Sequence, residues 1–217
     1  MLTNYDAKAV AEVMGIAFLQ GPNAGASTAA TSAKAARSAK PSIGATTGGF
    51  VINIGDAAVR VVETRTNNRF AQFDKSAGGT NQPSAFKDFR VWPPSSVLIE
   101  KAVEKGLPRL VLRRVAEHLA GGDKTKISSL EWGVVPKTTL ERREEQLSPQ
   151  ESERTERVAR LFVHARRALG TEAEAREFMT TPHPQLDGRS PIDATRTDLG
   201  TRRTEQILNA LVYGLAL

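Results

Sequence analysis

The chain has 217 residues, with 30 lysines and arginines against 24 aspartates and glutamates, so its formal net charge is +6. It contains no cysteine, which excludes disulfides, thiolate zinc sites, iron–sulfur clusters and a cysteine nucleophile. No apolar run approaches the roughly 20 residues of a membrane-spanning helix, and the first residues carry too few basic side chains for a secretory signal, so we expect a cytoplasmic protein.

The first part of the chain differs in composition from the rest. Apolar residues at helical spacing in residues 5–19 predict a short amphipathic helix. Two β-rich runs, 50–54 and 59–62, are separated by a Gly-Asp pair and predict a β-hairpin. Between the predicted helix and the predicted hairpin, residues 25–49 are mostly Ala, Ser, Thr and Gly. These residues have little to bury and are typical of a flexible linker. We therefore interpret residues 1–95 as a variable, largely flexible extension of low complexity.

Helix signals become dense after residue 95. Ser96 can cap a helix that ends at Gly106, and Pro108 fits the first turn of a second helix. A short third segment follows over residues 125–131. Pro136 opens a fourth segment, which we expect to continue as a helix to a point near residue 147.

The last third of the chain begins with a strong helix start. Ser148-Pro149-Gln150-Glu151 is a capping box with proline at the first helical position. Further helices are expected after Thr171 and after Thr197. In the last helix we expect an apolar stripe formed by Leu199, Ile207, Leu208, Leu211 and Val212. The predicted fold class is all-α, with a helical unit over residues 95–217.

We find no constellation of residues that carries chemistry. His118, His164 and His183 are far apart and occur in no metal-binding spacing, and the glycines form no phosphate-binding loop. Paired glutamates such as Glu144-Glu145 are typical of solvated helix faces. We expect no catalytic residue, no cofactor and no metal site, so the chain is predicted not to be an enzyme.

Residues 107–147 have the outline of a helix-turn-helix. In this motif the first turn of the recognition helix contacts base edges in the major groove, and nearby basic side chains neutralise phosphates. The prediction is a DNA contact through Lys137, Thr138, Thr139, Arg142 and Arg143. The alternative is a solvated helix face, on which these basic side chains are balanced by Glu141, Glu144 and Glu145.

Five short stretches in the second half of the chain form a recognisable pattern. Residues 139–143, Thr-Leu-Glu-Arg-Arg, fit T-L-x-R-R, and residues 147–154 fit L-S-x-x-E-S-x-R. Residues 178–191 fit W-L-x-x-P-x-x-x-L-x-G-x-x-P, although Phe178 stands in place of tryptophan and Asp187 stands where a small residue is common. Thr197 to Gly200 fit T-x-x-G, and Tyr213-Gly214 fit a closing Y-G. In order and spacing, residues 97–217 resemble the Xre/MbcA/ParS antitoxin family.

The resemblance implies a function. Members of the family are antitoxins of type II toxin–antitoxin systems, paired with RES-domain toxins that consume NAD or transfer ADP-ribose from it. The C-terminal domain holds the toxin inactive by blocking its NAD site. Members often dimerise through the helix-turn-helix region and repress their own operon. The implied partners are therefore a RES-domain toxin, operator DNA, and a second copy of the chain or a larger toxin–antitoxin assembly, with no membrane.

The resemblance also suggests a division of the chain. Residues 96–147 correspond to an Xre-like helix-turn-helix and dimerisation region, and residues 148–217 to a connecting helix and the toxin-binding domain. Arginine and tyrosine are residue types that often anchor interfaces. The predicted toxin-binding residues are Arg202, Arg203, Gln206, Asn209, Tyr213 and Leu217.

Two further hypotheses follow. Truncation after Ile207 is expected to abolish neutralisation while leaving the rest folded. The alternative function is a stand-alone helix-turn-helix transcriptional regulator, whose C-terminal domain binds another protein.

Overall fold

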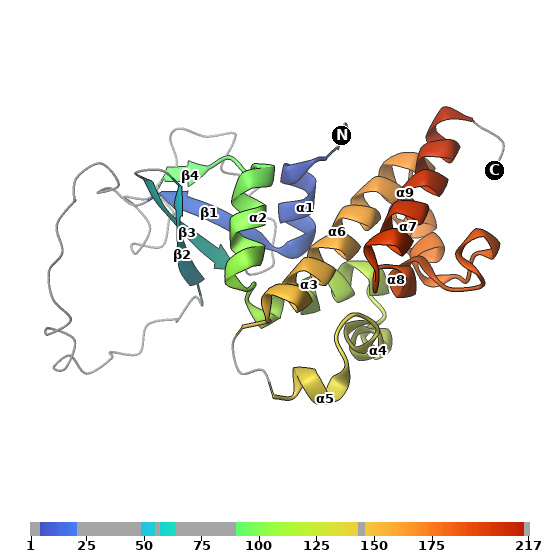
Figure 1. Ribbon diagram of the computed structural model, residues 1–217, viewed down its shortest axis with the longest axis horizontal. Helices are drawn as coiled ribbons and strands as arrows, with labels where there is room; N and C mark the ends of the chain where they lie inside the picture. Colours follow the sequence, from blue (N-terminus) through green and yellow to red (C-terminus); the bar gives the residue numbers. More distant parts are fainter. Residues whose placement is uncertain (1–4, 21–48, 55–56, 64–89, 143–145, 215–217) are drawn as a thin grey trace, which may run out of the picture.

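The computed structural model describes residues 5–20, 49–54, 57–63, 90–142 and 146–214. These residues are mostly helical, in agreement with the predicted class, and a small antiparallel sheet accompanies the helices (Figure 1). The elements are, in chain order, α1 (Ala7–Met14), β1 (Ile16–Gln20), β2 (Gly49–Ile54), β3 (Ala57–Glu63), β4 (Arg90–Trp92), α2 (Ser96–Lys105), α3 (Arg109–Ala120), α4 (Lys124–Val134), α5 (Lys137–Leu140), α6 (Pro149–Leu169), α7 (Glu172–Thr180), the 3-10 turn η2 (Pro184–Leu186), α8 (Pro191–Ala194) and α9 (Asp198–Tyr213).

The first helix is shorter than its predicted range of 5–19. It begins after Asp6, whose carboxylate accepts a hydrogen bond from the backbone N–H of Ala9 at 2.9 Å. It ends at Gly15, which has a φ of 62°, a left-handed conformation that glycine adopts without steric cost. The chain then turns into β1, so Phe18 belongs to a strand and not to the helix.

The beginning of the chain is part of the main hydrophobic core. Val10, Val13, Met14 and Phe18 are at most 1% exposed and belong to the same buried cluster as the apolar residues of α6. The interpretation of residues 1–95 as an extension outside the helical unit is therefore wrong for α1 and β1. Their apolar residues are numerous enough to bury a helix face, and burial of that face against α3 and α6 offsets the entropy of ordering the segment.

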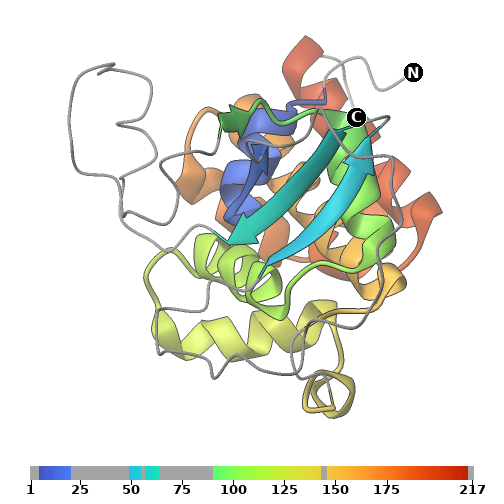
Figure 2. The ribbon, with the colours of Figure 1, turned by 90° about the vertical axis from the view of Figure 1, so that its left-hand side faces the viewer.

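The sheet has the strand order β2-β3-β1-β4, and all three pairs are antiparallel. Strands β2 and β3 are consecutive in the chain, with Ile54 opposite Ala57, and β3 pairs on its other side with β1. Figure 2 shows these strands in front of the helical part, beside α2. The linker predicted for residues 25–49 lies almost entirely outside the described residues.

The region after α2 contains three helices in sequence. The turn between α3 and α4 is Gly121-Gly122-Asp123, and α4 is longer than the predicted segment over 125–131. In contrast, α5 has only four residues, so the prediction of a helix reaching to a point near residue 147 is wrong. Leu147 instead donates its backbone N–H to the Leu107 carbonyl at 2.9 Å, and this pairing ties the chain to the start of α3.

Helix α6 is the centre of the molecule and contacts α1, α2, α3, α4, α7 and α9 (Figure 1). Its predicted capping box is confirmed: the Ser148 hydroxyl accepts from the Glu151 N–H at 3.3 Å, and the Glu151 carboxylate accepts from the Ser148 N–H at 2.7 Å. Its inward side chains include Val158, Leu161 and Phe162, all fully buried.

Within the described residues, no helix combines the length and the apolar character needed to cross a lipid bilayer.

Candidate functional site

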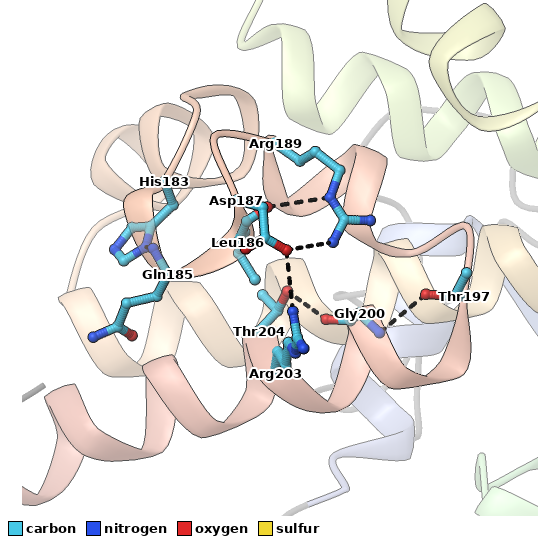
Figure 3. Close-up of polar contacts among 9 residues, drawn as sticks. All are labelled: His183, Gln185, Leu186, Asp187, Arg189, Thr197, Gly200, Arg203 and Thr204. Atoms are coloured by element: carbon cyan, nitrogen blue, oxygen red, sulfur yellow. Dashed lines mark hydrogen bonds and ion pairs between the residues drawn. The ribbon is translucent and has the colours of Figure 1, made fainter.

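Helix α9 is held at its start by the threonine and glycine of the T-x-x-G motif. The Thr197 hydroxyl accepts a hydrogen bond from the Gly200 N–H at 3.1 Å and caps the helix (Figure 3). A Cβ atom added to Gly200 would lie 2.2 Å from the Ala194 carbonyl oxygen, so only glycine allows α9 to approach α8 this closely. These two motif residues therefore have a structural role.

The buried face of α9 is small and partly polar. It consists of Gly200, Thr201, Thr204, Ile207 and Leu208. The Thr201 and Thr204 hydroxyls donate to the carbonyls of Thr197 and Gly200, both at 3.0 Å, so neither hydroxyl is buried without a partner. One helix face, which meets α6, α8 and the turn η2, is used for packing.

The opposite face of α9 is open to solvent. Leu199 and Tyr213 stand near its two ends and are 64% and 66% exposed. Between them, at helical spacing, lie the exposed side chains of Arg202, Arg203 and Gln206. We call Leu199, Arg202, Arg203, Gln206 and Tyr213 the open face of α9. It spans about 21 Å at 1.5 Å per residue.

The predicted apolar stripe of α9 is only partly correct. Ile207 and Leu208 are buried, whereas Leu199, Leu211 and Val212 are 64%, 41% and 42% exposed. Periodicity alone placed Leu199 inside, but its position lies on the open face, opposite the packing side. Leu199 is thus a residue of the candidate site that sequence reasoning missed, and a helical-wheel count from the fully buried Leu208, which lies about 180° away, is the signal that finds it.

The two arginines of the open face have different partners. Arg202 lies 3.0 Å from the Asp198 carboxylate, one turn earlier in the same helix. Arg203 lies 3.2 Å from the carboxylate of Asp187, in the loop before α8 (Figure 3). Both pairs are solvent-exposed, so each contributes little to the stability of the fold.

The other predicted toxin-binding residues are placed less favourably. Asn209 is half-buried beside His164 of α6; burial lowers the pKa of that histidine, and the Asn209 side chain opposes the shift. Asn209 therefore helps to join α9 to α6. Leu217 lies outside the described residues.

Helix α9 is also joined to the beginning of the chain by a mostly buried polar network. The Tyr5 hydroxyl donates to the Glu156 carboxylate at 3.0 Å. Arg160 lies 3.7 Å from the same carboxylate and 3.5 Å from Glu205 of α9. Burial raises the pKa of Glu156, and the positive charge of Arg160 opposes that shift. The network connects Tyr5, just before α1, with α6 and α9.

The predicted DNA-binding residues lie around the single turn of α5. Lys137 and Thr138 are exposed and Thr139 is partly exposed, while Arg142 donates its Nε–H to the Thr138 carbonyl at 3.1 Å. The Lys137 ammonium is 3.8 Å from Glu141 and 5.0 Å from the ring centre of Trp132, which is 42% exposed. Arg143 lies outside the described residues.

The L-S-x-x-E-S-x-R stretch is explained by folding alone. Besides the capping box, the buried Ser152 hydroxyl accepts from the Leu107 N–H at 2.8 Å. Arg154 donates to the Gly133 carbonyl at 2.6 Å and so ties α6 to α4. Its pKa is lowered to about 10, chiefly by burial. These side chains are engaged inside the molecule and are not candidates for binding a partner.

The histidines do not converge on a site. Burial lowers the pKa of His118 and, as noted, of His164, while His183 accepts a hydrogen bond from the Gln185 N–H at 3.2 Å in its loop. Across the part of the chain that the structure describes, no group of three or more His, Asp or Glu side chains is arranged to hold a metal ion.

The comparison with protein families adds to this geometry. Residues 164–214 match the family described as the antitoxin Xre/MbcA/ParS C-terminal toxin-binding domain. The match begins near the end of α6, covers α7 and α8, and includes all of α9 with its open face. No curated protein matches the chain. The C-terminal part of this chain is thus similar to the toxin-binding domain of Xre/MbcA/ParS antitoxins, which supports an antitoxin with a toxin as its partner.

Proposed function

We propose that this chain is the antitoxin of a type II toxin–antitoxin system and neutralises a RES-domain toxin by blocking its NAD site. The observation that carries the proposal is the open face of α9, which lies within the matched segment and presents apolar and cationic side chains that the fold does not use. Exposed leucine and tyrosine at the ends of one helix face favour a protein partner.

The chemistry of the open face suits the proposed target. A pocket that binds NAD accommodates a cationic nicotinamide ring, and an arginine can pair with carboxylates of such a pocket. Arg202 and Arg203 stand side by side on the open face and are 71% and 45% exposed. In this proposal Leu199 and Tyr213 anchor the helix at its two ends, and the arginines enter the toxin's nucleotide site.

The test measures NAD consumption by a purified RES-domain toxin in the presence of the full-length chain. Wild type is expected to stop the reaction at a one-to-one ratio, and the R202A/R203A double variant to require at least tenfold more protein, roughly the loss expected when interface anchors are truncated. Arg113→Ala is the matched control, because Arg113 is also an exposed arginine paired within its helix, with Glu117 at 3.4 Å. Failure of wild type to inhibit the toxin would overturn the proposed function, and equal inhibition by all three proteins would overturn the role of the two arginines.

The neutralisation test uses point variants and not the truncation after Ile207. Leu208 is fully buried, so that truncation would remove a core side chain as well as the end of the open face. Loss of neutralisation by the truncated chain would therefore not separate binding from folding.

We further propose that the chain represses its own operon, as a dimer or within a toxin–antitoxin assembly. The turn at α5 supports DNA contact through Lys137, Thr138, Thr139 and Arg142, and Arg143 follows directly in the sequence. Lys137→Ala combined with Arg142→Ala is expected to weaken operator binding and to reduce its salt dependence by about two phosphate contacts. An unchanged affinity and salt slope would exclude this face.

The alternative function is a stand-alone transcriptional regulator whose C-terminal domain binds another protein. Affinity purification of the tagged full-length chain from its source cells separates the two. Recovery of a stoichiometric RES-domain protein supports the antitoxin, whereas recovery of DNA and an unrelated protein supports the regulator.

A further inference from the structure

Asp187 has an unusual backbone conformation. With a φ of 57° it is the one non-glycine residue with positive φ within the described ranges, and it ends the turn η2. The next residue, Gly188, donates its N–H back to the His183 carbonyl at 3.2 Å, and this closure across Asp187 requires the left-handed conformation. Glycine adopts it without steric cost, and aspartate is tolerated at some cost. The presence of aspartate therefore points to a use for its carboxylate.

The carboxylate of Asp187 faces two guanidinium groups (Figure 3). One of its oxygens lies 3.4 Å from Arg189 and 3.2 Å from Arg203. Arg189 is also held by its own loop, because its Nε–H donates to the Leu186 carbonyl at 3.1 Å. The contact with Arg203 is different, since it joins the loop to α9 across 16 residues of sequence.

This contact sets the direction of one arginine of the open face. Arg202 is drawn toward Asp198 at the start of α9, whereas Arg203 is drawn sideways toward the loop. A long arginine side chain loses considerable conformational entropy when it is immobilised in an interface. A carboxylate that already restricts Arg203 in the free protein reduces that loss.

We propose that Asp187 is a positioning residue that preorganises Arg203 for entry into the nucleotide site of the toxin. The inference rests on the proposed function, and it assigns to the loop before α8 a part in the affinity of the open face. Asp187 itself need not contact the toxin, because its effect passes through Arg203.

The test is a double-mutant cycle with the full-length chain and a RES-domain toxin. Asp187→Asn keeps a residue that tolerates positive φ but removes the charge, and it is expected to weaken binding about fivefold, the upper range for an exposed ion pair. In the Arg203→Ala background the same substitution is expected to have no effect. Equal affinity of Asp187→Asn and wild type, or an equal loss in both backgrounds, would overturn the inference.

Two controls separate positioning from folding and from the proposed function. Asp187→Gly removes the backbone cost along with the charge, so it is expected to bind as weakly as Asp187→Asn while unfolding at the same temperature as wild type or higher. In the free chain, NMR of the arginine Nε–H groups is expected to show Arg203 restricted in wild type and mobile in Asp187→Asn. Identical mobility in both would overturn the inference even if no toxin binds, whereas failure of wild type to bind a RES-domain toxin would overturn the proposed function alone.

Discussion

Helices α6 and α9 begin and end in the same way but serve different purposes. Each starts at a hydroxyl N-cap, Ser148 or Thr197, and each ends at a left-handed glycine, Gly170 or Gly214. Helix α6 buries large apolar residues along most of its length and contacts helices on several sides. Helix α9 packs through one narrow face and leaves leucine, valine and tyrosine exposed. Local helix signals are thus shared, and the neighbours of each helix decide whether its apolar residues stabilise the fold or remain available to a partner.

The largest expected effect concerns the core face of α6. Phe162→Ala removes a fully buried ring and is expected to lower the free energy of unfolding by about 3–5 kcal/mol. Leu199→Ala on the open face of α9 is the control, expected to change it by no more than about 0.5 kcal/mol. Urea unfolding followed by circular dichroism measures both, and similar losses would contradict the distinction between the two helices.

The next effect tests the close packing of α9 on α8. Gly200→Ala would place a Cβ atom 2.2 Å from the Ala194 carbonyl oxygen, so we expect destabilisation of about 1–3 kcal/mol. Gly133→Ala is the matched control within α4, where a Cβ would lie 3.7 Å from Ile192 in ordinary contact. This control is expected to be neutral or stabilising by up to about 1 kcal/mol. If thermal unfolding shows no difference between the variants, the tight approach at Gly200 is not required.

A third prediction concerns the open face itself. Tyr213→Ala is expected to leave unfolding unchanged within about 0.5 kcal/mol, because the side chain is 66% exposed. The affinity for the toxin is expected to fall by about 2 kcal/mol, roughly 30-fold, as for an aromatic anchor of an interface. Titration calorimetry with a RES-domain toxin measures the affinity. Retained affinity would restrict the binding site to the start of α9.

The smallest effect concerns the network that joins the two helices. Burial raises the pKa of Glu156 above its ordinary value of 4.5, so the folded chain binds this proton more tightly than the unfolded chain. The contribution of Glu156 therefore favours folding below pH 4.5 and is lost as the pH rises through the raised, folded-state value. The Glu156 carboxylate is surrounded by Arg160, Arg157, Glu205 and Tyr5. These four residues stay unchanged when Glu156 alone is substituted.

Glu156→Gln removes this titration but keeps an oxygen that accepts from Tyr5. The stability of wild type relative to the variant is expected to decrease between pH 4 and pH 7, measured by urea unfolding at intervals of one pH unit. Parallel pH profiles would show that Glu156 titrates normally and would contradict the raised pKa that its burial between Tyr5, α6 and α9 causes.

The C-terminal half of the chain could be predicted well from the sequence because its signals are local. The capping box at Ser148, the T-x-x-G start of α9 and the glycine ends of the helices act within one helical turn. The site was predicted in part: Arg202, Arg203, Gln206 and Tyr213 lie on one open face. Asn209 does not, because it turns toward His164.

The sequence by itself determined where most helices begin and end and which short stretches resemble a toxin-binding domain, because capping and periodicity involve residues close together in the chain. Only the tertiary structure decided that α1 and β1 belong to the core, that α5 stops after one turn, and that Arg203 pairs with the loop before α8. Each of these outcomes depends on a distant neighbour: Tyr5 meets Glu156 across 151 residues, Leu147 meets Leu107, and Asp187 meets Arg203. Burial and pairing at such separations follow from how the helices pack, which no local pattern encodes.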